Sequence, residues 1–296
     1  MPRTDQTGGL PLTDEQVSRY WADGYCHGLR AVSAETAGQW RAELEGIERD
    51  WLDRDLPLPL NTYKRVNAHA VMPLAANIAR HPALLDIVES ILGPDIMIWS
   101  AEFFIKEPRT RQVVSMHQDL TYWGLGAIDN LTTAWIALSP ATRASGCMDF
   151  VRGSHKNEIL PHADTYSQNN LLSRGQEIQV DVNDVDKTAI ELLPGEISLH
   201  HGLMIHGSGP NSSDDRRIGV AIRYLSPAAK QEVADRDYAM LARGADRHGH
   251  FVNIAPPTTL FSPNSLALYD EIRAAQAKAL AAGASGDVAL YAASGG

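Results

Sequence analysis

The sequence predicts a mainly β protein, folded as a sandwich or barrel, with helices on its flanks. Between about residues 95 and 225, short runs of β-forming residues alternate with turns rich in Gly, Pro, Asn and Asp. Before and after this region the apolar residues recur at helical spacings instead. A chain of 296 residues is long enough for one large core. We therefore expect a single domain over residues 1–296, with a helical part at 13–93, the β core at about 95–225 and a C-terminal loop and helix at 226–296.

Helix signals mark both flanks of the β region. Thr13 and Ser33 are N-cap residues that precede acidic residues, so each is expected to begin a helix. A third helix is expected from Leu74 to Leu92, because a Gly-Pro pair follows it and ends the apolar pattern. A last helix is expected from about Asn264 to Ala282. These helices are predicted to pack on a core that the strands provide.

Nine runs between the helical parts are predicted as strands, because each is rich in β-forming residues and bounded by turn residues. They cover residues 96–106, 111–119, 130–139, 147–153, 177–182, 189–194, 196–201, 203–209 and 216–224. A polar stretch from His155 to Gln176 interrupts the series. Long polar insertions in compact β domains frequently carry function, so we expect this one to border an active site.

The composition argues against several classes of protein. The formal net charge is −10, so the strongly basic character typical of nucleic-acid binding is absent. No apolar run approaches the roughly 20 residues of a membrane helix. The first residues lack the apolar core of a secretory signal, and two cysteines, Cys26 and Cys147, cannot form a disulfide framework. We expect a cytoplasmic protein that acts on a small molecule and binds neither nucleic acid nor membrane; the sequence indicates no oligomeric state.

Two His-x-Asp pairs are candidates for a metal site. In a strand, side chains two residues apart point to the same face, so a histidine nitrogen and a carboxylate oxygen can reach one metal ion. His117 and Asp119 follow a β-type run, where this geometry is expected. His162 and Asp164 follow a proline in the polar insertion, where it is not guaranteed. We predict that the first pair binds metal and the second does not, although a single pair of this kind also arises by chance.

A third block, ISLHHGLMIHGSGPNSSDDRR, adds histidines and arginines to these pairs. Its three histidines lie near the end of a predicted strand. Two histidines and one carboxylate leave three positions of an octahedral Fe(II) ion open, the arrangement of oxygen-activating non-heme iron sites. The HExxH motif of many zinc hydrolases is absent. An arginine on the next strand could bind the carboxylate of a keto acid through two hydrogen bonds.

These blocks resemble the phytanoyl-CoA dioxygenase family, which comprises Fe(II)- and 2-oxoglutarate-dependent oxygenases with a double-stranded β-helix (a jelly-roll, cupin-like fold). The resemblance implies a reaction that uses Fe(II), 2-oxoglutarate and O2, with ascorbate as a supporting reductant, and releases succinate and CO2. Arg152 departs from the family pattern, which has proline there. The resemblance extends over roughly residues 60–225 and rests on HQDL at 117–120, AW at 134–135, GCMDFVRGSHK at 146–156 and HGSGPNSSDDRR at 206–217.

The resemblance also implies roles for individual residues. His117, Asp119 and His206 correspond to the iron ligands, and the family's 2-oxoglutarate arginine lies eleven residues after the last of these, at Arg217. Strand alternation by itself leaves Arg216 and Arg217 open, but the face that includes Arg217 is less apolar, which suits a cavity. Halogenating relatives have a small residue in the place of Asp119, so hydroxylation is favoured. The other residues implied at the cosubstrate are Phe103, Trp135, Ser208 and, by register from the His-Pro pair at 81–82, Arg65.

The substrate is expected to be a small polar metabolite, oxidised at an unactivated C–H bond, and not a bulky lipid thioester. Tyr122 and Trp123 follow the first His-x-Asp pair, in a stretch that lines the substrate space of relatives. Two other classes of function stay open. One is a non-catalytic, cupin-like metal-binding protein, and the other is a metal-dependent hydrolase or isomerase on the same barrel. Polar residues expected around the entrance are His155, His162, Arg243 and His250.

Overall fold

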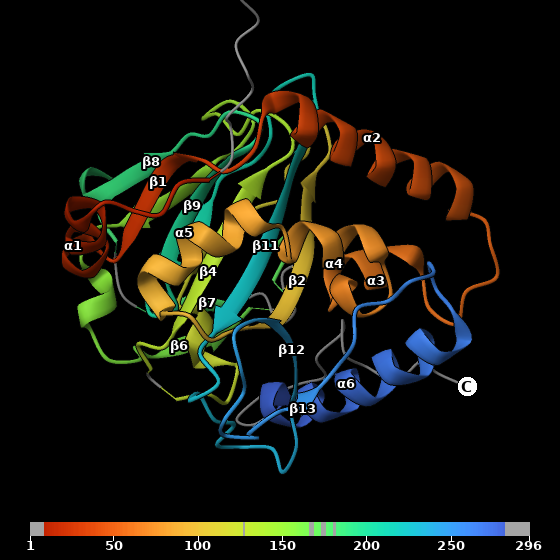
Figure 1. Ribbon diagram of the computed structural model, residues 1–296. Helices are drawn as coiled ribbons and strands as arrows, with labels where there is room; N and C mark the ends of the chain where they lie inside the picture. Colours follow the sequence, from red (N-terminus) through yellow and green to blue (C-terminus); the bar gives the residue numbers. More distant parts are fainter. Residues whose placement is uncertain (1–8, 127, 166–168, 173–175, 180–181, 282–296) are drawn as a thin grey trace, which may run out of the picture.

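A computed structural model describes residues 9–126, 128–165, 169–172, 176–179 and 182–281, and it confirms a mainly β architecture with flanking helices (Figure 1). Two sheets, antiparallel except for the β12–β13 pair, form the double-stranded β-helix, and a third pair of strands lies in the polar insertion. The large sheet contains, in spatial order, β1 (Tyr25–Arg30), β9 (Glu196–His201), β4 (Leu131–Ala137), β11 (Arg217–Leu225), β2 (Ile96–Lys106), β12 (Tyr238–Arg243) and β13 (Val252–Asn253). The smaller sheet contains β3 (Val114–His117), β10 (His206–Ser208), β5 (Met148–Val151) and β8 (Lys187–Ile190), and the pair is β6 (His162–Asp164) with β7 (Gln176–Ile178).

The helices cover the outer face of the large sheet (Figure 1). Alternation along β11 separates its two faces, because Ile218, Val220 and Ile222 join the helix-covered core while Arg217 and Arg223 line a cavity on the inner face. The apolar outer face therefore anchors the sheet, and the inner face is available for a site. The helices are α1 (Asp14–Asp23), α2 (Ala34–Trp51), α3 (Leu60–Arg65), α4 (Pro73–Ala79), α5 (Pro82–Leu92) and α6 (Pro263–Ala281).

The predicted helix over residues 74–92 is divided in two, which corrects that expectation. Pro82 lacks a backbone N–H and disfavours the helical conformation of the preceding residue. His81 is accordingly extended, with φ −61° and ψ 127°, and it precedes the first residue of α5. The N-caps at Thr13 and Ser33 are confirmed, since each side chain accepts a hydrogen bond from a backbone N–H three residues later.

Four strands were not predicted from the sequence, namely β1, β6, β12 and β13. β1 has no clear alternation and forms by pairing with β9, with a bulge between Cys26 and Leu29. β12 lies in a charged segment and pairs with β2. Both depend on partners distant in sequence, which a local pattern does not reveal. Among the described helices, none is both long and apolar enough to cross a membrane.

Candidate metal centre

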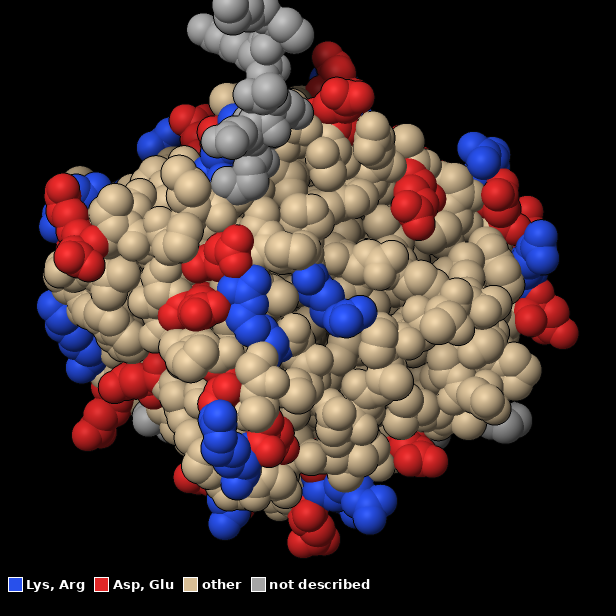
Figure 2. All heavy atoms as spheres, viewed as in Figure 1, with Lys and Arg blue, Asp and Glu red and all other residues tan. Residues whose placement is uncertain are grey.

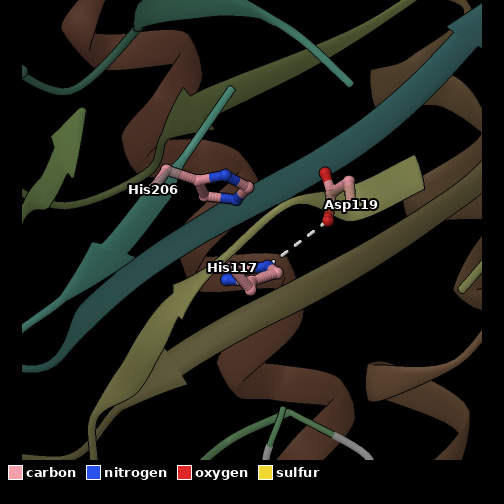
Figure 3. A group of neighbouring side chains, drawn as sticks. All are labelled: His117, Asp119 and His206. Carbon is pink, nitrogen blue, oxygen red and sulfur yellow. Dashed lines mark ion pairs between the residues drawn. The ribbon is translucent and has the colours of Figure 1, made fainter. Parts of the chain in front are cut away.

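Three side chains with metal-binding atoms converge inside the β-helix. His117 ends β3, Asp119 follows it by two residues, and His206 begins β10. β3 and β10 are neighbours, and His117 and His206 are directly opposite each other in the register. One ligand atom from each of the three residues lies within 4.8 Å of the others, and all three are buried (Figure 3). The distance between His117 Nε2 and Asp119 Oδ1 is 3.4 Å.

The hydrogen bonds of both histidines favour metal binding through Nε2. His117 Nδ1 is 2.9 Å from the carbonyl oxygen of Ser115, and His206 Nδ1 is 2.9 Å from that of Met204. A carbonyl oxygen only accepts, so each Nδ1 carries the proton and each Nε2 keeps its lone pair. Such a partner on the second nitrogen is the usual arrangement of a metal-bound histidine. The donor set of two imidazoles and one carboxylate therefore fits Fe(II).

The charges at this centre are also suited to a cation. Burial alone would raise the pKa of Asp119, but its polar surroundings, formed by three histidines and Arg223, outweigh this effect and hold that pKa well below its usual value. Thr133 Oγ1 donates to Asp119 Oδ2 at 3.3 Å. Burial lowers the pKa of His206 well below its usual value, and the nearby His117 adds to this effect. An ionised carboxylate beside a neutral imidazole is the protonation state that metal binding requires.

A buried cation without a carboxylate partner lies in the same cavity. Arg217 is 1% exposed, and within the described part of the chain no carboxylate lies within salt-bridge distance of it. Its Nε has no hydrogen-bond partner among the described residues. The guanidinium carbon is 5.2 Å from the ring centroid of Trp135. Burying an unpaired charge is strongly unfavourable, so this guanidinium is expected to bind an anion that enters the cavity.

Lys106 is a second buried basic side chain beside Arg217, and the two residues are opposite each other in the β2–β11 register. Its ammonium donates to Ser208 Oγ at 2.6 Å and also to the carbonyl oxygen of Gly209. Burial and the positive charge of Arg217 lower the pKa of Lys106 to about 6. An anion bound beside Arg217 would favour the charged form of Lys106, so this end of the cavity suits an anionic ligand.

The pKa of Lys106 predicts how the stability of the ligand-free protein depends on pH. An unfolded lysine has a pKa of about 10.4, so between about pH 6 and pH 10 the unfolded chain binds more protons than the folded chain. Stability should therefore rise with pH in this window, by at most about 1.4 kcal/mol per pH unit from this residue. Lys106→Met should remove that contribution. Denaturant titrations from pH 6 to pH 8 measure it, and equal pH slopes in both proteins would contradict the prediction.

Only some of the residues expected to contact the cosubstrate line the cavity. Ser208 and Trp135 line the cavity together with Arg217. Phe103 does not, since it is fully buried in the core between the large sheet and the helices. The neighbouring Phe104 lines the cavity instead, because alternation along β2 turns it to the inner face.

Arg65, on α3, lies at the edge of this region. Its guanidinium carbon is 4.5 Å from the ring centroid of Phe104, and its Nη2 donates to the carbonyl oxygen of Leu171 at 2.6 Å. Its positive charge acts on the buried Arg217 and contributes to the lowering of that residue's pKa, after burial itself. Arg65 is therefore close enough to influence the anion-binding end of the cavity.

The residues expected at the substrate entrance divide into two groups. Tyr122 and His162 form an edge-to-face pair 5.5 Å apart, next to the metal centre, and Trp123 stacks at 5.1 Å on Trp99. His162 Nε2 accepts a hydrogen bond from the backbone N–H of Gln118 at 3.0 Å, so this nitrogen is already engaged.

The remaining three lie elsewhere. His155 Nε2 is 3.1 Å from the carbonyl oxygen of Trp21, and His250 Nδ1 is 3.0 Å from that of Ala229. Arg243 forms salt bridges on the surface, with Asp86 and Glu89 of α5. Neither these three nor the first group is among the described residues that line the cavity. The polar character of these segments does not mean that their side chains line the cavity, because the side chains form hydrogen bonds and salt bridges with other elements.

Several cavity residues were not expected from the sequence. Thr133, His200 and Arg223 line the cavity beside Asp119, and Lys106 lies behind Ser208. Strand alternation was the available signal, because Arg223 shares the face of Arg217. The charged side chains on the helix-covered side form no comparable cluster: Figure 2 shows acidic and basic groups interspersed across that face.

The fold and the donor set together define the class of non-heme Fe(II)- and 2-oxoglutarate-dependent oxygenases. The sequence model of phytanoyl-CoA dioxygenase matches residues 20–219 of the chain. The chain therefore belongs to the phytanoyl-CoA dioxygenase family, which confirms the resemblance found in its motifs.

Individual relatives agree with this assignment. A probable phytanoyl-CoA dioxygenase of Caenorhabditis elegans is 28% identical over 239 residues, which are 74% of this chain and 77% of the relative. A probable alpha-ketoglutarate-dependent hypophosphite dioxygenase of Stutzerimonas stutzeri is 29% identical over 168 residues, 55% of this chain and 57% of the relative. Among solved structures, the apo form of the non-heme monooxygenase ThoJ matches with a TM-score of 0.80 and 32% identity, over 90% of this chain and 97% of its own. The epimerase SnoN with Fe3+, alpha ketoglutarate and nogalamycin RO shares the fold, with a TM-score of 0.60 and 20% identity over 83% of this chain and 95% of its own.

Proposed function

We propose that this protein hydroxylates an unactivated C–H bond of a small polar molecule, with His117, Asp119 and His206 as the iron ligands and Arg217 as the 2-oxoglutarate anchor. One observation carries the proposal most strongly. A buried guanidinium without a carboxylate partner lies in the same cavity as the three metal-binding side chains. A protein that only stored metal would have no use for this cation, whereas a dicarboxylate cosubstrate needs one.

Different cavity residues contact different parts of the cosubstrate. The guanidinium of Arg217 offers two parallel N–H donors to the distal carboxylate, and the hydroxyl of Ser208 lies at the same end. Trp135 contacts the guanidinium through its ring face and excludes water from that end. Bound iron supplies the oxidising chemistry, in which O2 is consumed and 2-oxoglutarate becomes succinate and CO2.

Hydroxylation is favoured over halogenation because of Asp119. Its carboxylate occupies the place that a halide ligand would need, and Thr133 holds the second oxygen. A metal-dependent hydrolase or isomerase is the second candidate, but a keto-acid anchor has no role in such a reaction.

Anaerobic addition of Fe(II) and 2-oxoglutarate tests the proposal without knowledge of the substrate. A weak visible metal-to-ligand absorption band should appear only when both are present, because the keto acid binds to iron. Admission of O2 should then release succinate slowly. A protein that binds Fe(II) but develops no band and no succinate would exclude the oxygenase and leave the metal-binding alternative.

A further inference from the structure

We propose that Arg223 and His200, on either side of Thr133, form a second anion-binding site in the cavity, which holds a carboxylate of the primary substrate. The inference rests on the proposed function and names the chemical class of its substrate. The three residues form one row across the large sheet: Arg223 of β11 is opposite Thr133 of β4, and Thr133 is opposite His200 of β9. Neighbouring strands are about 4.8 Å apart, so the row spans roughly 10 Å. All three side chains are buried and line the cavity.

The guanidinium of Arg223 is held in place by residues of the neighbouring strand β2 and by aromatic rings. Its Nη1 is 2.7 Å from Glu102 Oε2 and 3.5 Å from Ser100 Oγ. The guanidinium carbon lies 5.3 Å from the ring centroid of Trp123 and 5.8 Å from that of Phe104. Glu102 is not among the described residues that line the cavity, whereas Arg223 is. A planar guanidinium fixed in this way can present a donor edge to a carboxylate.

His200 provides the second observation. The ring is 1% exposed, and within the described residues neither of its nitrogens has a hydrogen-bond partner. Its Nε2 is 3.8 Å from Asp119 Oδ2, which is too long for a hydrogen bond. A buried polar group without a partner is unfavourable, so a ligand in the cavity is the natural partner. A neutral imidazole has one N–H donor, which a carboxylate oxygen can accept.

The two arginines of the cavity lie at different positions along β11. Arg217 and Arg223 are six residues apart on β11, a separation of about 20 Å along an extended strand. A five-carbon keto acid is no longer than about two residues of extended backbone, roughly 7 Å. Arg217 lies at the Ser208 end, while Arg223 belongs to the row beside Asp119. We assign the second guanidinium to a second ligand; because both arginine side chains also span part of the distance along the strand, a loss of 2-oxoglutarate affinity in the Arg223 variants would instead assign it to the cosubstrate and overturn the proposal.

Matched acids and amides test the site in the anaerobic protein loaded with Fe(II) and saturating 2-oxoglutarate. The probes are phenylacetate with phenylacetamide and N-acetylglycine with N-acetylglycinamide, and the readout is the change each causes in the visible band. In the wild type we expect each acid to bind at least about tenfold more tightly than its amide, as for hydrogen bonds to charged groups. Equal effects of acid and amide, or no effect of either, would overturn the proposal.

Variants test whether the preference for acids over amides depends on Arg223. Arg223→Gln combined with Glu102→Gln removes the cation without leaving a buried carboxylate unpaired, and it should abolish the preference for acids. Arg223→Lys keeps the charge but loses the planar fork, so an intermediate preference is expected. Arg152→Gln, at an exposed salt bridge with Asp23, is the matched control and should behave like the wild type.

Iron and 2-oxoglutarate affinities are measured in the same variants. Unchanged affinities with loss of the acid preference support a substrate site. Loss of iron in the double variant, or an acid preference that survives it, would overturn the proposal, because Arg223 would then act only on Asp119 or on nothing in the cavity. Absence of the visible band in the wild type before any probe is added would instead be a failure of the proposed function.

Discussion

His117→Ala protein, purified in parallel with the wild type, is expected to contain little iron, whereas His162→Ala should retain it. His117 offers Nε2 to the same point as Asp119 and His206. Loss of a residue that only supports a ligand commonly weakens metal affinity by about 10- to 100-fold, so loss of a ligand should weaken it by at least about 100-fold. Iron content by elemental analysis and Fe(II) affinity by titration measure the two variants.

His162→Ala is a matched control, because it also removes a histidine from a His-x-Asp pair near the centre. The His162 nitrogens lie beside the Gln118 N–H and the Leu160 carbonyl, at 3.0 and 2.7 Å, so the residue supports the neighbouring loop. Some loss of thermal stability is therefore compatible with the assignment. Equal iron retention in both variants, or loss only in His162→Ala, would show that the wrong pair was chosen.

The parts of the fold that were predicted are those that local patterns determine. Alternating apolar residues on β11 specify which face is buried, and N-cap residues specify where α1 and α2 begin. The same alternation, together with the family spacing, selected Arg217 in place of Arg216. In the structure Arg216 points outward and forms salt bridges with Glu48 and Glu107.

The parts that were missed depend on contacts between distant segments. Phe103 and Phe104 are adjacent and chemically identical, and only the register of β2 against β11 decides which one faces the cavity. His200 was one of three histidines in a single block, and nothing local distinguishes it from its neighbour. In the structure His200 faces the cavity, whereas His201 pairs with Asp129 at 3.0 Å.

Arg217→Gln is expected to weaken 2-oxoglutarate binding by roughly 10- to 100-fold while iron binding is kept. The substitution replaces a charged, two-donor contact with a neutral one, and hydrogen bonds to charged groups contribute about 1.5–3 kcal/mol. Since about 1.4 kcal/mol corresponds to a tenfold change, this range gives the expected loss. Titration of the anaerobic Fe(II) protein with 2-oxoglutarate, followed by the visible band, measures the affinity. Fe(II) titration without 2-oxoglutarate checks that the metal centre is intact.

Arg216→Gln is the control, because it changes the adjacent residue on the opposite face of the same strand. It breaks a largely buried salt bridge with Glu48 and a more exposed one with Glu107, so it should lower stability, but it should leave cosubstrate affinity unchanged. Folding itself should not suffer in Arg217→Gln, since removal of a buried cation without a carboxylate partner also removes an unfavourable burial. Ligand-free Arg217→Gln should therefore be at least as stable as the wild type, although it binds 2-oxoglutarate more weakly. Loss of cosubstrate affinity in Arg216→Gln but not in Arg217→Gln would reverse the assignment of the anchor.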